Sequence, residues 1–418
     1  MKINFLLTVF TTFIFFCCHD KVAKQPEANL TQIEEKKDSI PEMNLLDSEY
    51  KLRERLTDSV LKIMTPNVPT MNLNKLNRPF YKHMVGVFNG DSAILNLNFA
   101  HLTYDGKWAF AGTVFIPSKV RAYEVWGVKS DTAKFLDFYV SDKAEANFDN
   151  LFTMLGSFGD KNVLKGLILD NKTLIQGVFE FQETNTEGVT QFDLSECFVN
   201  KPYIDTKKLL KEDRKMSIVY TSSLPIAKPA NKKDVLFFLN NHLKLNSNCE
   251  IHCDSFIIEG TKAIDVALKD LEEDEHLRNS EYSVVARNSI YWNNDDLVVI
   301  FKLFWSNTEL DTYGGAGVSF ETYDIKRKRK LTEKEVFKKS YDEEKFAEAI
   351  DNYFNLEARY DDKGKRELLL NMSNGFTSKG FYMVGKGNHG WYVSPVFIPY
   401  KVVEPFLRDD FKNQYWKK

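Results

Sequence analysis

Between Phe80 and Phe198, apolar residues recur at every second position, which is the period of a β-strand with one buried face. The run Leu95–Phe99 shows the pattern clearly, because large apolar residues alternate there with asparagines. Asn89-Gly90 and Asp105-Gly106 separate such runs, and these dipeptides favour the tight turns of β-hairpins. Further strand-like runs are Trp108–Ile116, Tyr123–Val128, Phe135–Val140, Phe152–Phe158, Val163–Leu169, Leu174–Phe181 and Thr190–Leu194. We therefore expect residues 76–200 to form an antiparallel β-meander that closes into a small barrel or a sandwich.

Residues 201–418 combine the strand period with the spacing of amphipathic helices. The segment Asp234–Leu245, for example, carries its apolar residues at helical spacing, whereas Tyr282–Trp292 favours a strand. The other expected helices are Thr261–His276, Leu331–Phe337, Asp342–Phe354 and Val402–Phe411. The other expected strands are Ser217–Tyr220, Leu297–Trp305, Val318–Ile325, Phe381–Val384 and Trp391–Ile398. The sequence thus predicts an α+β fold overall, in which the β-meander precedes an α+β domain with a mainly antiparallel sheet.

Residues 19–75 precede the meander and are interpreted as a tether. The first part, His19–Pro41, is polar and charged with little periodicity. Five apolar residues then follow at spacings of 7, 4, 4 and 4, namely Leu45, Leu52, Leu56, Val60 and Met64. This spacing predicts a stalk helix, which packs either on its own domain or against a partner protein.

Residues 1–18 have the character of a targeting segment. Lys2 is followed by the apolar segment Ile3–Phe16, which as a helix would span about 21 Å, less than the ~30 Å hydrocarbon core of a membrane. Two cysteines and then polar sequence follow. The segment resembles the signal peptide of bacterial lipoproteins, in which a cysteine after the apolar stretch receives the lipid.

That resemblance implies lipid attachment at Cys18, with Cys17 as the alternative, because the motif prefers a small residue before the modified cysteine and Phe16 is bulky. Several acyl chains would hold the protein on a membrane of the bacterial cell envelope, facing the periplasm or the cell surface. An ordinary cleaved signal peptide or an inserted anchor is the alternative interpretation.

The charge balance disfavours one class of partner. The 418 residues include 56 Lys and Arg and 59 Asp and Glu, a formal net charge of −3, so we expect no nucleic-acid partner. The local exception is the basic run Lys326–Lys330, which lies where a hairpin turn is expected, between Ile325 and Leu331. A solvated turn is the simpler interpretation, and a contact with anionic polymers or lipid headgroups is the alternative.

Aromatic residues make up 14% of the chain and include 33 Phe and 18 Tyr. They follow the strand-like runs, which favours sheet cores filled by aromatic side chains over a ligand cavity.

The segment Cys249–Cys253 contains the sharpest cluster of metal-ligand residue types, because His252 lies between its two cysteines. Zinc sites commonly space their cysteines by two residues and use a second ligand pair, whereas three residues intervene here and no second pair exists. Outside the cytoplasm a disulfide, which could also involve Cys197, or a buried free cysteine is the favoured interpretation. We expect no metal ion and no cofactor.

Motifs of common enzymes are missing from the sequence. There is no Gly-x-Ser-x-Gly, Gly314–Gly317 is not followed by Gly-Lys-Ser/Thr, and Glu272–Glu275 lacks the ligand spacing of a calcium loop. A nucleophilic serine that meets His276 or His389 in space stays open. No catalytic residue is assigned from the sequence.

Short motifs in the C-terminal half occur in a fixed order: Gly314-Gly315-Ala316, Tyr323-Asp324-Ile325, Lys330-Leu331-Thr332, Val336-Phe337, Val396-Phe397-Ile398-Pro399-Tyr400 and Pro405-Phe406-Leu407. This order is similar to the uncharacterised domain that forms the extracytoplasmic part of lysozyme-sensing anti-sigma factors and also occurs beside peptidoglycan deacetylase domains. The resemblance covers Ser217–Phe411 and implies an envelope-facing binding or sensing module. Gly317 stands where that family typically has a histidine, and the tyrosine-rich segment before the last strand is altered to Asn388–Tyr392.

We therefore expect a membrane-anchored cell-envelope lipoprotein that binds or senses a protein or a cell-wall glycan such as peptidoglycan without catalysis. A hydrolase acting on envelope polymers is the alternative. The expected contact residues are His389, Trp391 and Tyr392, because an imidazole and two aromatic rings in one loop suit a protein or sugar surface. If the protein is an enzyme, we expect a deep pocket with convergent titratable groups. If it is a binding module, we expect a shallow aromatic face.

Overall fold

The computed structural model of the chain describes residues 76–101, 107–129, 135–141, 151–159, 162–170, 175–203, 216–227, 282–308, 316–354, 372–385 and 395–416. All of them belong to the unit Leu52–Lys418. The predicted signal peptide and tether, and the helices expected at Asp234–Leu245 and Thr261–His276, lie outside these residues.

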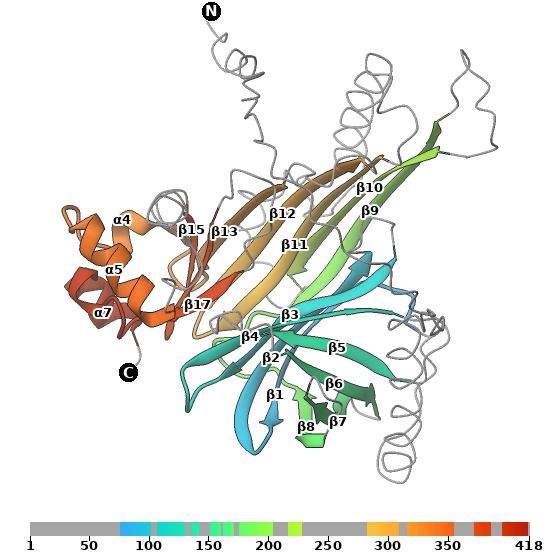
Figure 1. Ribbon diagram of the computed structural model, residues 1–418, viewed down its shortest axis with the longest axis horizontal. Helices are drawn as coiled ribbons and strands as arrows, with labels where there is room; N and C mark the ends of the chain where they lie inside the picture. The colour runs from blue at the N-terminus through green and yellow to red at the C-terminus, as the bar shows by residue number, and fades with distance from the viewer. Residues whose placement is uncertain are drawn as a thin grey trace, which may run out of the picture. The chain divides into compact units, whose positions relative to one another are not determined.

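Eight strands form a closed antiparallel barrel (Figure 1). Each strand pairs with the next in sequence, and β8 pairs with β1 through a register that places Met84 opposite Glu183. The strands are β1 (Phe80–Phe88), β2 (Asp91–His101), β3 (Trp108–Ile116), β4 (Arg121–Val128), β5 (Leu136–Ser141), β6 (Leu151–Phe158), β7 (Val163–Leu169) and β8 (Ile175–Glu183). The predicted meander is therefore a barrel, and the predicted α+β fold class is confirmed.

The interior of the barrel is filled by apolar side chains from every strand. Aromatic rings supply much of this core, and Phe99, Phe110 and Phe138 are at most 1% exposed. Inward-facing glycines let the strands approach closely, since a Cβ atom on Gly112 would lie 1.8 Å from the carbonyl oxygen of Asn96. The aromatic residues of this region thus pack a core, as the sequence pattern suggests.

A second sheet has the strand order β14-β13-β12-β11-β10-β9. Its strands are β9 (Phe192–Tyr203), β10 (Met216–Ala227), β11 (Tyr282–Asn294), β12 (Leu297–Thr308), β13 (Ala316–Asp324) and β14 (Arg329–Leu331). The pairing is antiparallel except between β10 and β11, which run parallel. A three-stranded antiparallel sheet of β15 (Met372–Phe376), β16 (Gly380–Gly385) and β17 (Val396–Pro399) completes the strands.

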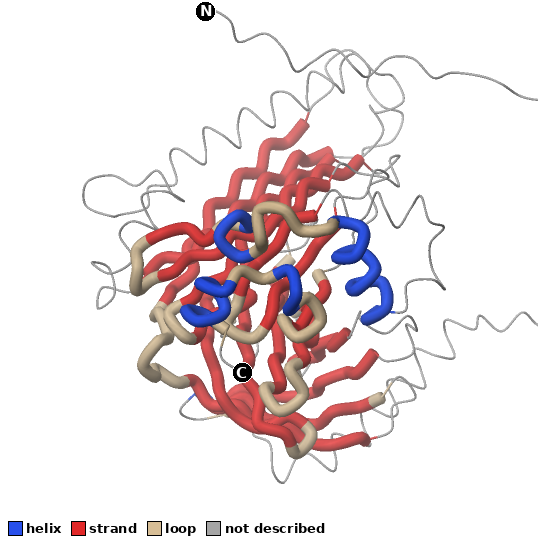
Figure 2. The backbone as a smooth tube through the Cα atoms, turned by 90° about the vertical axis from the view of Figure 1, so that its left-hand side faces the viewer, coloured by secondary structure: helices blue, strands red, loops and turns tan. Residues whose placement is uncertain are grey.

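Short helices gather beside the three-stranded sheet (Figure 2). They are α4 (Glu333–Val336), α5 (Glu343–Phe354), the 3-10 helix η7 (Glu404–Phe406) and α7 (Asp409–Tyr415). The helix expected at Leu331–Phe337 is shorter, because Leu331 ends β14 and Thr332 caps α4. The helix expected at Val402–Phe411 is divided in two, since Leu407 leaves the helical path to form a β-bridge with Phe337.

The outer face of β2 is covered by β11, which changes the expected character of the strand. The alternation Leu95–Phe99 predicts one buried face, yet Asn96 and Asn98 on the other face are each 1% exposed. Asn98 donates to the carbonyl oxygen of Ile290 at 3.0 Å and accepts from its N–H at 3.0 Å. The asparagines are therefore not solvent-facing residues but the polar contacts that join the barrel to the second sheet.

An aromatic contact reinforces this junction. Phe115 of β3 packs edge-on against Trp292, with ring centroids 4.9 Å apart, and against Phe397 at 5.5 Å. Phe115 thereby belongs to the core of the second sheet although it lies on a barrel strand. The second sheet and the three-stranded sheet share one apolar core, and Phe115 on the outer face of the barrel packs into it.

Candidate functional site

A β-bulge at Tyr291 organises the surface where the barrel meets the second sheet. The register of β11 against β12 shifts between Ile290 and Trp292, so Tyr291 is the extra residue and has no partner in the ladder. Its carbonyl oxygen instead accepts hydrogen bonds from the Thr113 hydroxyl at 2.6 Å and the Asn96 amide at 3.2 Å. The bulge is thus fixed by side chains from β2 and β3 of the barrel.

The Tyr291 side chain continues the contact on the next barrel strand. Its hydroxyl donates to Glu124 Oε1 of β4 at 2.8 Å, and the Tyr382 hydroxyl of β16 lies 3.4 Å from the Tyr291 carbonyl oxygen. Burial raises the pKa of Tyr382 well above its ordinary value, while a hydrogen bond with Thr113 partly lowers it. The phenol of Tyr382 therefore stays neutral and serves as a hydrogen-bonding group.

These residues border a hollow of about 380 Å³, a volume that includes space open to solvent. We call it the seam hollow. Its barrel wall consists of Thr113, Arg121, Ala122, Tyr123, Glu124 and Ser141. Its opposite wall consists of Tyr291, Tyr353, Tyr382, Pro395, Val396 and Phe397. The walls thus come from three barrel strands, from β11 and β16, from α5 and from the start of β17.

The seam hollow is shallow and rich in aromatic rings and hydroxyl groups. Its volume includes space open to solvent, so it does not enclose a buried substrate. Tyr353 is 40% exposed. Arg121 and Glu124 supply one charge of each sign. Such a surface suits contact with a polar or aromatic partner group more than enclosure of a reacting molecule.

The expected contact residues His389, Trp391 and Tyr392 lie outside the described residues. Pro395, which follows Tyr392 by three residues, lines the seam hollow. Cys17, Cys18 and the cluster Cys249–Cys253 also lie outside the described part, and Cys197 lies in β9.

Sequence reasoning missed the residues of the seam hollow. The bulge at Tyr291 depends on its pairing with β12 and on polar partners in the barrel, and neither is visible in the local pattern. The asparagines of β2 were the one sequence feature that could have indicated this junction. Asparagines repeated along one face of a strand are compatible with a polar contact to another sheet as well as with exposure to solvent.

In the described ranges, no three His, Cys, Asp or Glu side chains lie close enough together to hold a metal ion. Among the helices within these ranges, none has the length and apolar character needed to cross a membrane.

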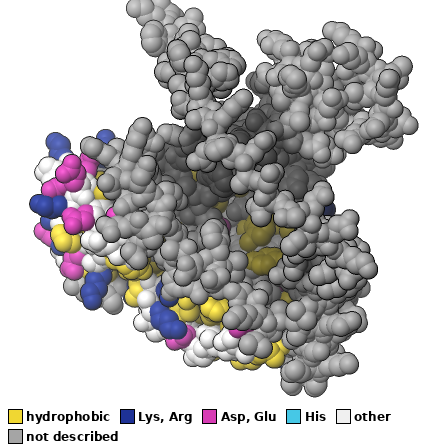
Figure 3. Space-filling model, viewed as in Figure 1, with side chains coloured by type: hydrophobic (Ala, Val, Ile, Leu, Met, Phe, Trp, Pro, Cys, Tyr) yellow, Lys and Arg dark blue, Asp and Glu magenta, His cyan; other side chains and the backbone are white. Residues whose placement is uncertain are grey.

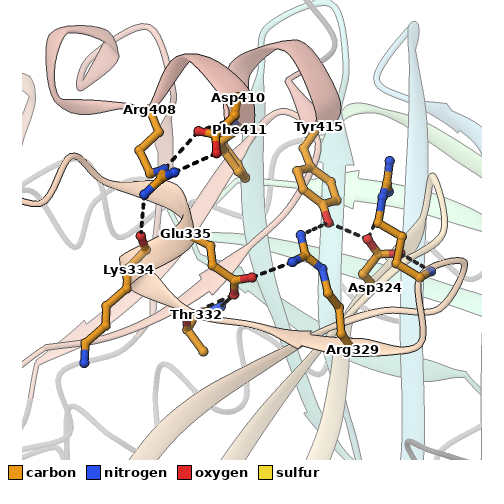
Figure 4. A network of polar contacts seen from close by, with 10 residues as sticks. Asp324, Arg329, Thr332, Lys334, Glu335, Arg408, Asp410, Phe411 and Tyr415 are labelled. Carbon is orange, nitrogen blue, oxygen red and sulfur yellow. Dashed lines mark hydrogen bonds and ion pairs between the residues drawn. The ribbon is translucent and has the colours of Figure 1, made fainter.

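The basic run spans the turn between β13 and β14 together with the start of β14, and it is anchored by internal ion pairs (Figure 4). Arg327 pairs with buried Asp324 at 3.0 Å, and Arg329 pairs with Glu335 at 2.6 Å. The Tyr415 hydroxyl of α7 donates to Asp324 and accepts from Arg329 at 3.0 Å. The two arginines therefore fix the C-terminal helix to the turn.

The lysines of the run divide between two environments. Lys330 pairs with Glu321 at 2.7 Å, and Lys302 reaches the same carboxylate at 2.9 Å. Lys326 and Lys328 are exposed at the tip of the turn. Figure 3 shows Lys and Arg side chains mixed with Asp and Glu side chains in the region of α5 and α7, so charges of both signs share this side of the molecule. The run acts as a structured hairpin turn, in agreement with the simpler interpretation of the sequence.

Comparison of the chain with protein-family models and with curated proteins gives no match. Among solved structures, it is similar to a member of the DUF3298 family from Bacteroides fragilis at 15% identity, with 55% of this chain and 98% of that chain covered and a TM-score of 0.38. It is also similar to a DUF3298 family protein from Pseudomonas aeruginosa PAO1 at 11% identity, with 53% and 96% covered and a TM-score of 0.31. Both likenesses extend over about half of this chain.

Proposed function

We propose that this chain is a lipid-anchored protein of the bacterial cell envelope that binds a protein or a cell-wall glycan without catalysis. The observation that carries the binding role is the seam hollow, which is a shallow surface of tyrosines and hydroxyl groups. A non-catalytic module needs a surface of this kind, because contact area from rigid aromatic side chains gives affinity at a low cost in conformational entropy.

The polar groups of the seam hollow support the same role. Glu124 already accepts a hydrogen bond from Tyr291, and the Tyr291 carbonyl oxygen is occupied by donors from the barrel. These groups are held in place before a ligand arrives, so little ordering remains to be done on binding. The segment with His389, Trp391 and Tyr392 leads directly to Pro395 at the edge of the hollow, and we propose that its aromatic residues extend the same contact surface.

The binding role is tested by capture of envelope components on the purified full-length protein. We expect Tyr353→Ala and Arg121→Gln to lose the captured partner, since both residues line the hollow and Tyr353 is exposed. Val178→Thr is the matched control, because Val178 is 59% exposed on the outer face of the barrel. Turnover of a wall polymer that disappears in Glu124→Gln or His389→Asn would instead establish the hydrolase alternative.

The anchor is tested separately by growth with a labelled fatty acid. We expect label in the wild-type protein and in Cys17→Ser, and no label in Cys18→Ser. Label that persists after both cysteines are changed to serine would show that the lipid is attached elsewhere or that the segment acts as an ordinary anchor.

A further inference from the structure

At one end of the barrel, the inward-facing rows change from apolar to polar. On β1 the row that contains Met84 and Phe88 begins with Phe80 and Lys82. On β8 the inward row ends at Glu183, which lies directly opposite Met84. Charged side chains on the inside of a small barrel break the pattern that specifies the core, and departures of this kind concentrate at functional sites.

Six residues at this end form what we call the mouth layer: Phe80, Lys82, His101, Trp108, Phe158 and Glu183. All of them are partly exposed, whereas the side chains directly beneath, such as Phe99 and Phe181, are fully buried. The mouth layer therefore covers the packed core of the barrel on one side and is accessible to solvent on the other.

The rings of the mouth layer make one continuous platform supported by Phe99. Phe80 stacks on Phe99 with ring centroids 5.1 Å apart, and Trp108 stacks on Phe99 at 4.9 Å. Phe158 meets the edge of Phe80 at 6.0 Å. The indole N–H of Trp108 has no hydrogen-bond partner in the part of the chain that the structure describes. It is a donor available to a ligand that lies on the platform.

A carboxylate from outside the barrel holds one end of the platform. One carboxylate oxygen of Glu196 in β9 accepts a hydrogen bond from the backbone N–H of His101 at 2.7 Å. The other oxygen lies 2.7 Å from the Nδ1 atom of His101. The imidazole in turn lies 3.9 Å from the Trp108 ring. Glu196 is thus a positioning residue that fixes His101 and, through it, the orientation of Trp108.

Lys82 and Glu183 form an ion pair at the edge of the platform. Their charged atoms are 2.5 Å apart, and the two side chains are only 16% and 20% exposed. The ammonium group lies 5.6 Å from the centre of the Phe80 ring and 5.9 Å from that of Phe158. Among the described residues, two of the three ammonium donors and most of the acceptor positions of the carboxylate stay open for further hydrogen bonds.

The ion pair favours a neutral ligand over a charged one. A charged ligand would draw one partner away and leave the other in a poorly hydrated place, which is strongly unfavourable. A neutral ligand with neighbouring hydroxyl groups can accept from Lys82 and donate to Glu183 at once, and the pair stays intact. The aromatic platform requires in addition a ligand with a flat apolar face.

We propose that the mouth layer is a binding site for a neutral saccharide. The apolar face of a sugar ring lies on Phe80 and Trp108, and its hydroxyl groups bind Lys82, Glu183 and the Trp108 indole N–H. This site shares no residue with the seam hollow, so the inference goes beyond the proposed function and stands or falls separately from it.

The test is calorimetric titration of the full-length protein, kept in a detergent without a sugar headgroup, with the trimer of N-acetylglucosamine. The trimers of glucosamine and of galacturonic acid serve as cationic and anionic probes. We expect the neutral trimer to bind most tightly. The double variant Lys82→Gln, Glu183→Gln keeps shape and removes both charges, and we expect it to weaken binding by about tenfold or more, as the loss of charge-assisted hydrogen bonds predicts.

Two controls separate this site from its surroundings. Val178→Thr lies on β8 like Glu183, and Val87→Thr lies on β1 like Lys82, but both side chains face outward, so both variants are expected to leave the affinity for the trimer unchanged. If the double variant does not fold, as seen in its thermal unfolding, Trp108→Phe keeps the ring, removes the N–H donor and is expected to weaken binding several-fold. The proposal is overturned by a neutral trimer that does not bind, by a charged trimer that binds more tightly, or by an affinity that the folded variants leave unchanged.

Discussion

The side-chain amide of Asn98 forms with Ile290 both hydrogen bonds that a neighbouring strand would form. Its Nδ2 donates to the Ile290 carbonyl oxygen at 3.0 Å, and its Oδ1 accepts from the Ile290 N–H at 3.0 Å. The amide also donates to the carbonyl oxygen of Ala111 at 3.0 Å. One side chain therefore satisfies backbone groups on two strands of different sheets.

Asn98→Leu is expected to lower the free energy of unfolding by about 3 kcal/mol, because it removes both hydrogen bonds that Asn98 forms with the buried backbone of Ile290. Urea denaturation measures the change. Ser92→Ala on the same strand is the control, since Ser92 is exposed, and it is expected to have little effect. An Asn98→Leu variant as stable as the wild type would mean that these bonds do not hold the junction together.

The stability of the fold is expected to fall in weak acid because of His83. Burial lowers the pKa of His83 below its ordinary value of 6.5, and a hydrogen bond with Asn96 offsets part of this change. As the pH falls below 6.5, the unfolded chain takes up a proton on this histidine before the folded chain does, so the free energy of unfolding decreases. Well above pH 6.5 the histidine is neutral in both states, so it no longer makes the stability depend on pH.

Urea denaturation at several pH values between about pH 5 and about pH 8 measures how the free energy of unfolding depends on pH, and a variant without His83 separates its contribution from that of other groups. His83→Gln removes the titrating group, and its stability is expected to depend less steeply on pH than that of the wild type, by at most about 1.4 kcal/mol per pH unit. Equal slopes for the two proteins would contradict the assignment to His83.

Tyr415→Phe is expected to destabilise the C-terminal end of the fold by about 2 kcal/mol. The phenol hydroxyl joins α7 to the basic turn, because it bonds both Asp324 and Arg329. The Asp324 carboxylate is 1% exposed and loses one of its donors in the variant. Hydrogen exchange is expected to rise first in α7. The exposed Asn413 lies on the same helix, and Asn413→Ala is expected to leave exchange unchanged.

Gly112 and Gly90 are expected to respond very differently to substitution by alanine. A Cβ atom on Gly112 would lie 1.8 Å from a backbone carbonyl oxygen, so the strands must move apart and a loss of about 3 kcal/mol or more is expected. Gly90 lies in the β1–β2 turn with φ +84° and has open space around it, so only the backbone conformation costs energy, about 1 kcal/mol. Thermal unfolding of the two variants ranks them, and the opposite order would contradict the close strand approach.

The alternation of the sequence is sufficient to locate the barrel strands, because side chains on a strand must point in turn toward and away from the core. It does not identify what lies against the outer face. Asn96 and Asn98 have the pattern of solvent-facing residues, and only the arrival of β11, nearly two hundred residues later, buries them. Long-range contacts of this kind are not encoded in local periodicity.

In the candidate sites, too, local features could be predicted from the sequence and long-range contacts could not. Lys82 and Glu183 lie on different strands at the two ends of the barrel sequence, and only barrel closure makes them a pair. The turn at Lys326–Lys330 was predictable, because a charged segment between two strand-like runs has few other structures. Its pairing with Tyr415 was not, since the partner comes from the last helix.

The pairing of β1 with β8 has a consequence for synthesis. About 100 residues separate the two strands, so at roughly 5–20 residues per second β1 waits on the order of 5–20 seconds for its second neighbour. During that interval its free edge is a template on which another nascent chain can add a strand. Lys82 is a charge on this strand, and it would be unpaired until Glu183 is made. Charged residues on an edge strand disfavour strand addition, so we expect the lysine that shapes the mouth of the finished barrel to protect the unfinished one as well.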